Sequence, residues 1–227
     1  MPVPLLDFHV HDAPSAPGIL ALRNRYPGSH PPETGPFTLG LHPWRVNPAQ
    51  LAKDLSAVAA GIRHPRCLAV GECGLDRCCA TPWPEQQRAF SAQLALAVQE
   101  DRPLVLHAVK AWAEIIAARN AARTQRPWAI HAFRGKRELA LDLVRHGFML
   151  SFGVALIQAP TMREALAAVP ADSFFLETDD APGADLARLY HVAADLRGIS
   201  VTELARRIFA NFAIFAGHGL RQRQSAE

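Results

Sequence analysis

Six side chains of types that bind divalent metal ions stand directly after, or near the ends of, short apolar runs in this sequence. Imidazole nitrogens and carboxylate oxygens suit zinc, manganese and similar ions. Six ligands are too many for one tetrahedral zinc with an open position, but they suffice for two ions that share a bridging carboxylate. Such a pair of ions is the usual clamp for in-line displacement at phosphorus. The residues are His9, His11, Glu72, His107, His131 and Asp179.

Each of these residues has an ordinary structural explanation when it is taken alone. Two histidines in the pattern His9-x-His11 can be core or surface residues, and Glu72 after Val-Gly can be a salt-bridge partner. Apolar strands seldom all end in metal-ligand types by accident, and unpaired polar groups buried there would be costly. The set as a whole therefore favours a metal centre.

The elements that must position these ligands are eight short runs that are mostly apolar on both faces, as strands of a parallel sheet are. In a strand, His9 and His11 point to the same side. The six ligands follow five of the eight runs. We expect strands at 3–8, 19–22, 37–41, 68–72, 104–107, 128–131, 148–152 and 174–177.

Helical patterns alternate with these strands, which predicts an α/β fold. Asn47 and Pro48 resemble a helix start, and Ser200 with Glu203 forms a capping box before the last helix. Eight strands indicate one (β/α)8 TIM-like barrel domain over residues 1–227, with its active face at the carboxyl ends of the strands. Residues 11–37 hold six prolines and no convincing helix, so the barrel should be irregular in its first βα unit.

Composition excludes several classes of protein. The chain has 227 residues, 49% of them hydrophobic and 20% charged, which excludes a disordered chain. No apolar run approaches the ~20 residues of a membrane span, and the N-terminus does not resemble a signal peptide. The net charge of +3 fits an anionic substrate but not a dedicated nucleic-acid-binding module. We expect a cytoplasmic enzyme, monomeric by default, and its Arg- and Ala-rich composition suggests a bacterial source.

The four cysteines lie close together, at 67, 73, 78 and 79, without a Cys-x-x-Cys pair. No second Cys or Cys/His cluster follows at the spacing of a zinc finger. We interpret them as reduced thiols, and only Cys73, next to Glu72, stands near a candidate ligand.

The sequence resembles the TatD family of metal-dependent deoxyribonucleases, which are amidohydrolase-like barrels. The resemblance recurs in the family's order and spacing over nearly the whole chain. It rests on DFHVH (7–11), GLHPW (40–44), AVGECGLD (69–76), PLVLHA (103–108), WAIHAFRGK (128–136), GFMLSFG (147–153) and FFLETDDAP (174–182).

The resemblance implies roles for the six residues. His9, His11, Glu72 and Asp179 match the ligands of a first divalent ion. His107 and His131 match those of a second, with Glu72 bridging the two. The ions could be zinc, manganese, magnesium or nickel. The implied activity is hydrolysis of DNA phosphodiester bonds, often from the 3′ end, by a metal-activated water whose proton Asp179 could accept.

The stretches around these ligands depart from the family pattern, which bears on the substrate rather than on the metal centre. The segment after His11 is shorter, and the Arg-Asn-x-Pro stretch after the last aspartate is absent. His42, Lys110 and Arg134 are candidate substrate contacts, although each could equally be a structural or solvated side chain. Trp44, Trp83, Trp112 and Trp128 could stack on bases or pack in the core. Asp76 and Asp180 are expected to be supporting or structural partners, and Glu177 is expected to hold the end of its strand.

Two other functions stay open. Related two-metal barrels cleave small-molecule amides, lactones or phosphoesters, but many of them bridge their ions with a modified lysine, and no lysine ends a predicted strand here. A barrel that binds metal or nucleic acid without turnover is the other alternative, and it would not need an intact set of six ligands.

Overall fold

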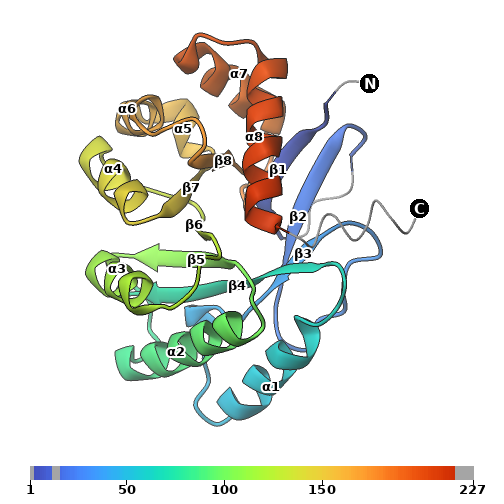
Figure 1. The fold of residues 1–227 in the computed structure, drawn as a ribbon, viewed down its shortest axis with the longest axis vertical. Helices are drawn as coiled ribbons and strands as arrows, with labels where there is room; N and C mark the ends of the chain where they lie inside the picture. The colour runs from blue at the N-terminus through green and yellow to red at the C-terminus, as the bar shows by residue number, and fades with distance from the viewer. Residues whose placement is uncertain (1–2, 12–15, 218–227) are drawn as a thin grey trace.

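The computed structural model describes residues 3–11 and 16–217, in which eight parallel strands form one sheet in sequence order (Figure 1). A parallel bridge between Val10 and Asp179, with the Asp179 N–H donating to the His9 carbonyl at 2.9 Å, joins the segment that follows the last strand to the end of the first. The predicted barrel is therefore confirmed. The strands are β1 (Leu5–Val10), β2 (Ile19–Arg25), β3 (Phe37–Leu39), β4 (Cys67–Asp76), β5 (Leu104–Val109), β6 (Trp128–Ile130), β7 (Phe148–Phe152) and β8 (Phe174–Leu176).

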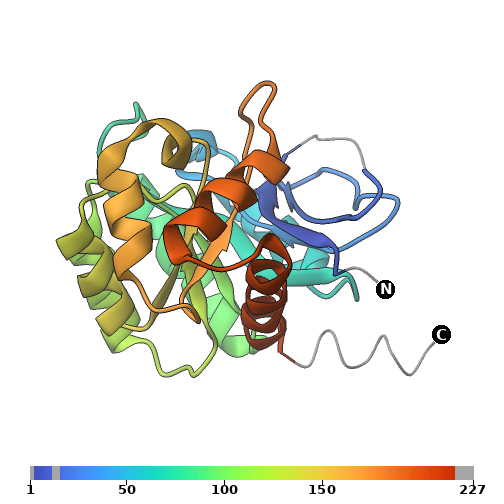
Figure 2. The ribbon, with the colours of Figure 1, turned by 90° about the horizontal axis from the view of Figure 1, so that it is seen from above.

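Helices pack against β1, β4, β5, β7 and β8, and α8 runs beside β1 in both ribbon views (Figures 1 and 2). No helix of the described residues is long and apolar enough to cross a membrane. The helices are η1 (Pro43–Arg45), α1 (Leu51–Gly61), α2 (Trp83–Gln99), α3 (Trp112–Ala121), α4 (Arg137–Arg145), α5 (Ala155–Gln158), α6 (Pro160–Ala168), α7 (Leu186–Arg197) and α8 (Val201–Ala216).

The irregularity predicted near the N-terminus is present. Among the described residues, none between β1 and β3 is helical. Residues 12–15 of this segment lie outside the described part. β2 is longer than predicted and reaches Arg25, which carries Asn24 to the carboxyl end of the barrel.

The ends of several other elements differ from prediction. β4 runs to Asp76, four residues past Glu72, because Gly74 and Leu75 continue the pairing with β5. The predicted helix start at Asn47 is wrong. Its side chain accepts a bond from the Ala49 N–H and makes a turn, so that α1 begins at Leu51. The Ser200 cap of α8 is confirmed, because its hydroxyl accepts the Glu203 N–H at 3.2 Å.

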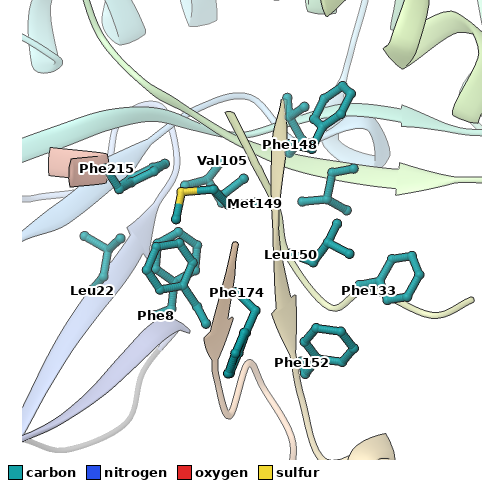
Figure 3. Close-up of a cluster of buried hydrophobic side chains, with 14 of the residues drawn as sticks. Phe8, Leu22, Val105, Phe133, Phe148, Met149, Leu150, Phe152, Phe174 and Phe215 are labelled. Atoms are coloured by element: carbon teal, nitrogen blue, oxygen red, sulfur yellow. The ribbon is translucent and has the colours of Figure 1, made fainter. Parts of the chain in front are cut away.

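Aromatic packing fixes the two strands that close the barrel. Phe8 of β1 stacks on Phe175 of β8 with ring centroids 3.9 Å apart, and Phe215 of α8 packs edge-on against Phe8 at 5.1 Å. Phe8 and Phe215 belong to the cluster of buried side chains in Figure 3. Because neighbouring side chains of a strand alternate in direction, a buried Phe8 turns His9 to the opposite face.

Candidate metal centre

Glu72 lies at the centre of the polar cluster, and its two carboxylate oxygens face different groups of histidines. Its side chain is only 2% exposed. Oε1 lies 2.6 Å from His131 Nε2 and 3.0 Å from Nδ1 of His107. His42 Nε2 approaches the same oxygen at 3.0 Å. This side of Glu72 therefore faces the ends of β5 and β6 and the loop after β3.

The other oxygen faces the end of β1. Glu72 Oε2 lies 3.5 Å from Nε2 of His9 and 4.0 Å from Nε2 of His11. Asp179 completes this side, with Oδ1 at 3.7 Å from the His9 nitrogen and 3.3 Å from the His11 nitrogen. All six predicted ligands thus meet in one cluster. A carboxylate with one oxygen toward each group has the arrangement that a bridge between two ions needs.

The cluster passes a test of fit to divalent ions. His9 Nε2 is buried and has no hydrogen-bond partner, although it points at the carboxylates of Glu72 and Asp179. A buried polar atom left without a partner is costly, and a bound cation would satisfy it. The ligand atoms of His9, His11 and Glu72 all lie within 4.8 Å of one another, and so do those of His42, Glu72 and His107. Neutral imidazoles and carboxylates are the donor set that zinc and manganese accept.

Charges in the cluster shift the ionisation of its members. Burial alone would lower the pKa of His131, but the carboxylates of Glu72 and Glu177 hold it well above its ordinary value. Burial likewise opposes ionisation of Glu72, yet His131 and hydrogen bonds from His107 and His42 hold its pKa well below normal. Without a metal, a protonated imidazole at His131 therefore balances the buried carboxylate, and a metal ion would have to displace that proton.

Three of the four candidate ligand histidines have a polar side chain near the second ring nitrogen, although Nδ1 of His131 forms no hydrogen bond. Asp76 Oδ2 lies 3.1 Å from Nε2 of His107, and the Tyr26 hydroxyl lies 3.1 Å from Nδ1 of His11. Glu177 Oε1, which accepts the Ala132 N–H at 2.6 Å, lies 3.5 Å from Nδ1 of His131. Such partners fix the ring orientation and direct the other nitrogen toward a metal. The contact of Asp76 with His107 agrees with its expected supporting role, and the bond from the Ala132 N–H shows Glu177 holding backbone beside its strand.

Asn24 is a residue that the sequence did not single out. It is 1% exposed, accepts the Glu72 N–H at 2.9 Å and donates to Glu72 Oε2 at 3.3 Å. Its oxygen also accepts the Thr38 hydroxyl at 3.1 Å. The only sequence signal is a polar amide in the run Leu-Arg-Asn, beyond the predicted end of the second strand.

Two buried glutamines of α2, seven residues apart on one face, fix the backbone beside the cluster. Gln86 accepts the Asp76 N–H at 2.8 Å and donates to the Asp76 carbonyl at 2.9 Å. Gln93 accepts the Leu41 N–H at 2.7 Å and donates to the Leu41 carbonyl at 3.1 Å. Since Leu41 precedes His42, α2 holds both the loop that carries His42 and the strand end that carries Asp76.

Of the candidate substrate contacts, His42 lies inside the cluster. Its Nδ1 accepts the Trp44 N–H at 3.0 Å, so the neutral ring carries its proton on Nε2, toward Glu72. Burial lowers the pKa of His42, which favours this neutral form. Lys110 and Arg134 are exposed. Lys110 directly follows β5, and Arg134 lines a small cavity of about 70 Å³ with Asp179 and Asp180.

All four cysteines are free thiols, as expected. Cys73 is fully buried in the core, where burial raises the pKa of its thiol. Its side chain therefore belongs to the packing of β4 rather than to the metal centre.

The chain is similar to proteins of a known family. The sequence profile described as TatD related DNase matches residues 29–216, most of the chain. The chain belongs to this family. A TatD relative from Citrobacter koseri, named 3′-5′ ssDNA/RNA exonuclease, is 33% identical over 148 residues, which cover 63% of this chain and 56% of the relative. The relative of that name from Escherichia coli is 32% identical over 148 residues, which cover 63% of this chain and 56% of that relative. The chain thus spans little more than half the length of these relatives.

Solved structures give the same family and fold. The crystal structure of a TatD homologue from Escherichia coli superposes with a TM-score of 0.70 and 25% identity, over 79% of this chain and 76% of that one. An uncharacterised amidohydrolase from Saccharomyces cerevisiae shares the fold with a TM-score of 0.67 at 12% identity, over 79% and 80% of the two chains.

Proposed function

We propose that this TatD-family chain hydrolyses phosphodiester bonds of single-stranded DNA from the 3′ end, at a centre of two divalent ions. The observation that supports it most directly is the position of Glu72, with one oxygen toward His9 and His11 and the other toward His107 and His131. The proposal takes His9, His11, Glu72 and Asp179 as ligands of one ion. It takes Glu72, His107 and His131 as ligands of the other.

Divalent ions bound there would lower the pKa of water toward ~7 and stabilise negative charge that develops on the phosphate. Asp179 is the carboxylate best placed to take the proton of the attacking water, since its side chain is 28% exposed whereas that of Glu72 is 2% exposed. Burial raises the pKa of Asp179, but the bond from His11 and the charge of His131 outweigh this and lower it. The side chain is thus an ionised base at neutral pH.

His42 has a separate task in this proposal. Its Nε2–H, fixed by the Trp44 N–H on the other ring nitrogen, is a donor at the edge of the cluster. With Glu72 engaged by ions, that donor can bind a non-bridging phosphate oxygen. Arg134 and Lys110 stand farther out and would contact the DNA backbone. Action as a monomer in the cytoplasm stays a prediction.

Release of nucleotides from 3′-labelled single-stranded DNA tests the proposal. Purified protein should release label with magnesium or manganese and not with a chelator. Glu72→Gln should reduce release at least about 100-fold, because it removes the charge between the two ligand groups. Glu164→Gln, an exposed residue of α6, is the matched control and should leave the rate unchanged.

Parallel substrates distinguish the alternatives. Release of label from 5′-labelled DNA would indicate hydrolysis from the 5′ end. Release from RNA would indicate that RNA is also a substrate. No release from any polymer, combined with metal-dependent hydrolysis of small phosphoesters or amides, would overturn the nuclease proposal in favour of a small-molecule hydrolase.

A further inference from the structure

Trp44 is a large aromatic side chain that stands exposed beside the candidate metal centre. It is 63% exposed, and it is the sole aromatic among the large hydrophobic residues that the described structure leaves exposed; Ile19 and Ile214 are the others. A tryptophan so open to water needs a reason, because burial of its ring would be favourable.

The exposed ring is nevertheless held in place. Its Nε1–H donates to Asp76 Oδ2 at 2.6 Å, and its backbone N–H donates to His42 Nδ1 at 3.0 Å. The ring also packs edge-on against His107, with centroids 5.6 Å apart, and the His42 ring lies edge-on to it at 5.0 Å. A fixed ring loses little freedom when a ligand stacks on it.

Arg45, the next residue of the same short turn, reaches the opposite half of the centre. Its guanidinium carbon lies 3.9 Å from the centroid of the Tyr26 ring, and the Tyr26 hydroxyl contacts His11. Trp44 contacts two of the three histidines that face Glu72 Oε1, while Arg45 stands over the residue that supports the other group. The turn Pro43–Arg45 therefore spans the rim of the whole centre with one ring and one positive charge.

The other three tryptophans lack this combination. Trp128 is fully buried. Trp83 is partly covered by the Arg77 guanidinium, 4.1 Å from its ring centroid. Trp112 packs toward Phe133, with ring centroids 6.3 Å apart.

We propose that the turn Pro43–Arg45 is a nucleotide-binding subsite, in which Trp44 stacks on a nucleobase of the DNA strand and Arg45 binds an adjoining phosphate. This inference rests on the proposed nuclease function and adds a base-recognising element to it. Stacking on a ring tolerates every base, since each base has an aromatic face. The subsite would thus hold a single strand without sequence preference, whereas a paired base inside a duplex has no free face to offer.

Binding of two oligonucleotides tests the stacking role by itself. One is a fluorescent single strand with hydrolysis-resistant linkages, and the other is the same strand with abasic sites at its 3′ end. Wild-type protein should bind the strand with bases on the order of tenfold more tightly than the abasic one. Trp44→Ala should abolish that difference, and Trp83→Ala should keep it. Binding of the strand with bases should also quench tryptophan fluorescence in wild type.

Trp44→Phe separates stacking from support of the metal ligands. Phenylalanine keeps an aromatic face but has no N–H for Asp76, so a stacking residue retains most of the base preference in this variant. If Trp44 acted only through Asp76, both Trp44→Phe and Trp44→Ala would keep the wild-type preference for bases. That result would overturn the subsite.

Arg45→Ala tests the phosphate contact. It should weaken binding of both strands equally, and it should lower the salt dependence of binding by about 0.7 in log–log slope, the value for one contact to a single strand. An unchanged slope would exclude Arg45 from the subsite. Failure of the nuclease proposal looks different: wild type would then neither bind the strand nor release nucleotides, whereas failure of the subsite alone leaves both in place with no preference for bases.

Discussion

Asn24 holds Glu72 at two points, with its side-chain oxygen on the Glu72 backbone N–H at 2.9 Å and its amide nitrogen on Glu72 Oε2 at 3.3 Å. Both residues are almost fully buried. The amide therefore fixes the position of the strand and the rotation of the carboxylate together. The carboxylate plane decides which oxygen faces which group of histidines.

Asn24→Ala should lower both stability and metal affinity. It leaves the Glu72 N–H and the Thr38 hydroxyl without their partner, which costs about 1–3 kcal/mol in the free energy of unfolding. It also frees the Glu72 carboxylate to rotate, and metal affinity should fall about 10- to 100-fold. Urea unfolding of the metal-free protein measures the change in stability, and metal titration measures the change in affinity. Asn47→Ala, an exposed control, should leave the metal affinity unchanged. Unchanged metal affinity in Asn24→Ala would show that Glu72 is positioned without it.

The barrel and the convergence of the six candidate ligands could be predicted because they depend on local signals. Apolar runs of strand length mark the core, and His9, His107 and His131 stand next to such runs. Parallel strands bring their carboxyl ends to one rim, so residues far apart in sequence meet without any knowledge of their contacts. Asn24 lacks such a signal, because its importance comes from a contact with a residue 48 positions away.

Asp76→Asn should weaken the metal centre through His107. The Asp76 carboxylate accepts from the His107 ring and the Trp44 indole at Oδ2 and from the Cys78 N–H at Oδ1. Asparagine keeps only one acceptor oxygen and has no charge, so its NH2 group must face either the two rings or the Cys78 N–H without accepting from them. A ring without this partner is less basic and less well oriented, so metal affinity should fall about 10- to 100-fold. Metal titration against Asp142→Asn, a half-buried control on α4 that pairs with Arg145, measures the loss of affinity. Equal affinities in the two variants would contradict the role of Asp76.

Metal affinity should rise with pH through and above the ordinary histidine range. The pKa of His131 is raised in the metal-free chain, so the proton is still bound at neutral pH, and metal binding must release it. One released proton gives a rise of about tenfold per pH unit, which ends where pH passes the raised pKa. The Glu72 pKa is lowered, so Glu72 adds no proton in this window.

Glu177→Gln should move that window to lower pH. The variant keeps an oxygen for the Ala132 N–H but removes a charge that raises the pKa of His131. Calorimetric titrations in buffers of different ionisation enthalpy count the protons released. An affinity independent of pH in wild type, or a window that stays in place in Glu177→Gln, would contradict this assignment.

Gln93→Leu should destabilise the chain and disturb the loop that carries His42. The buried amide pairs with both the N–H and the carbonyl of Leu41, and leucine leaves these groups unpaired at a cost of about 1–3 kcal/mol. Thermal unfolding measures the loss. Gln87→Leu, an exposed neighbour on α2, is the control and should stay near wild type. A loss no larger than in that control would show that Leu41 finds other partners.

The rim of the site could be predicted only in part, because rim contacts depend on how loops fold. His42 was expected near the centre and lies beside Glu72, but the ring orientation comes from the Trp44 N–H. Asn47 is a second residue whose contact depends on how its loop folds. Its side chain closes a turn on Ala49 instead of capping a helix, and both uses satisfy the same preference of asparagine for a nearby N–H.

Manganese binding to protein that a chelator has freed of metal tests the central role of Glu72 most directly. Titration followed by electron paramagnetic resonance counts the ions in each chain and detects whether two of them are coupled through a shared ligand. The account predicts two ions per wild-type chain with a coupled signal, and loss of that coupling in Glu72→Gln while Glu164→Gln keeps it. A single ion per wild-type chain, or a coupled pair that survives in Glu72→Gln, would contradict a bridging Glu72.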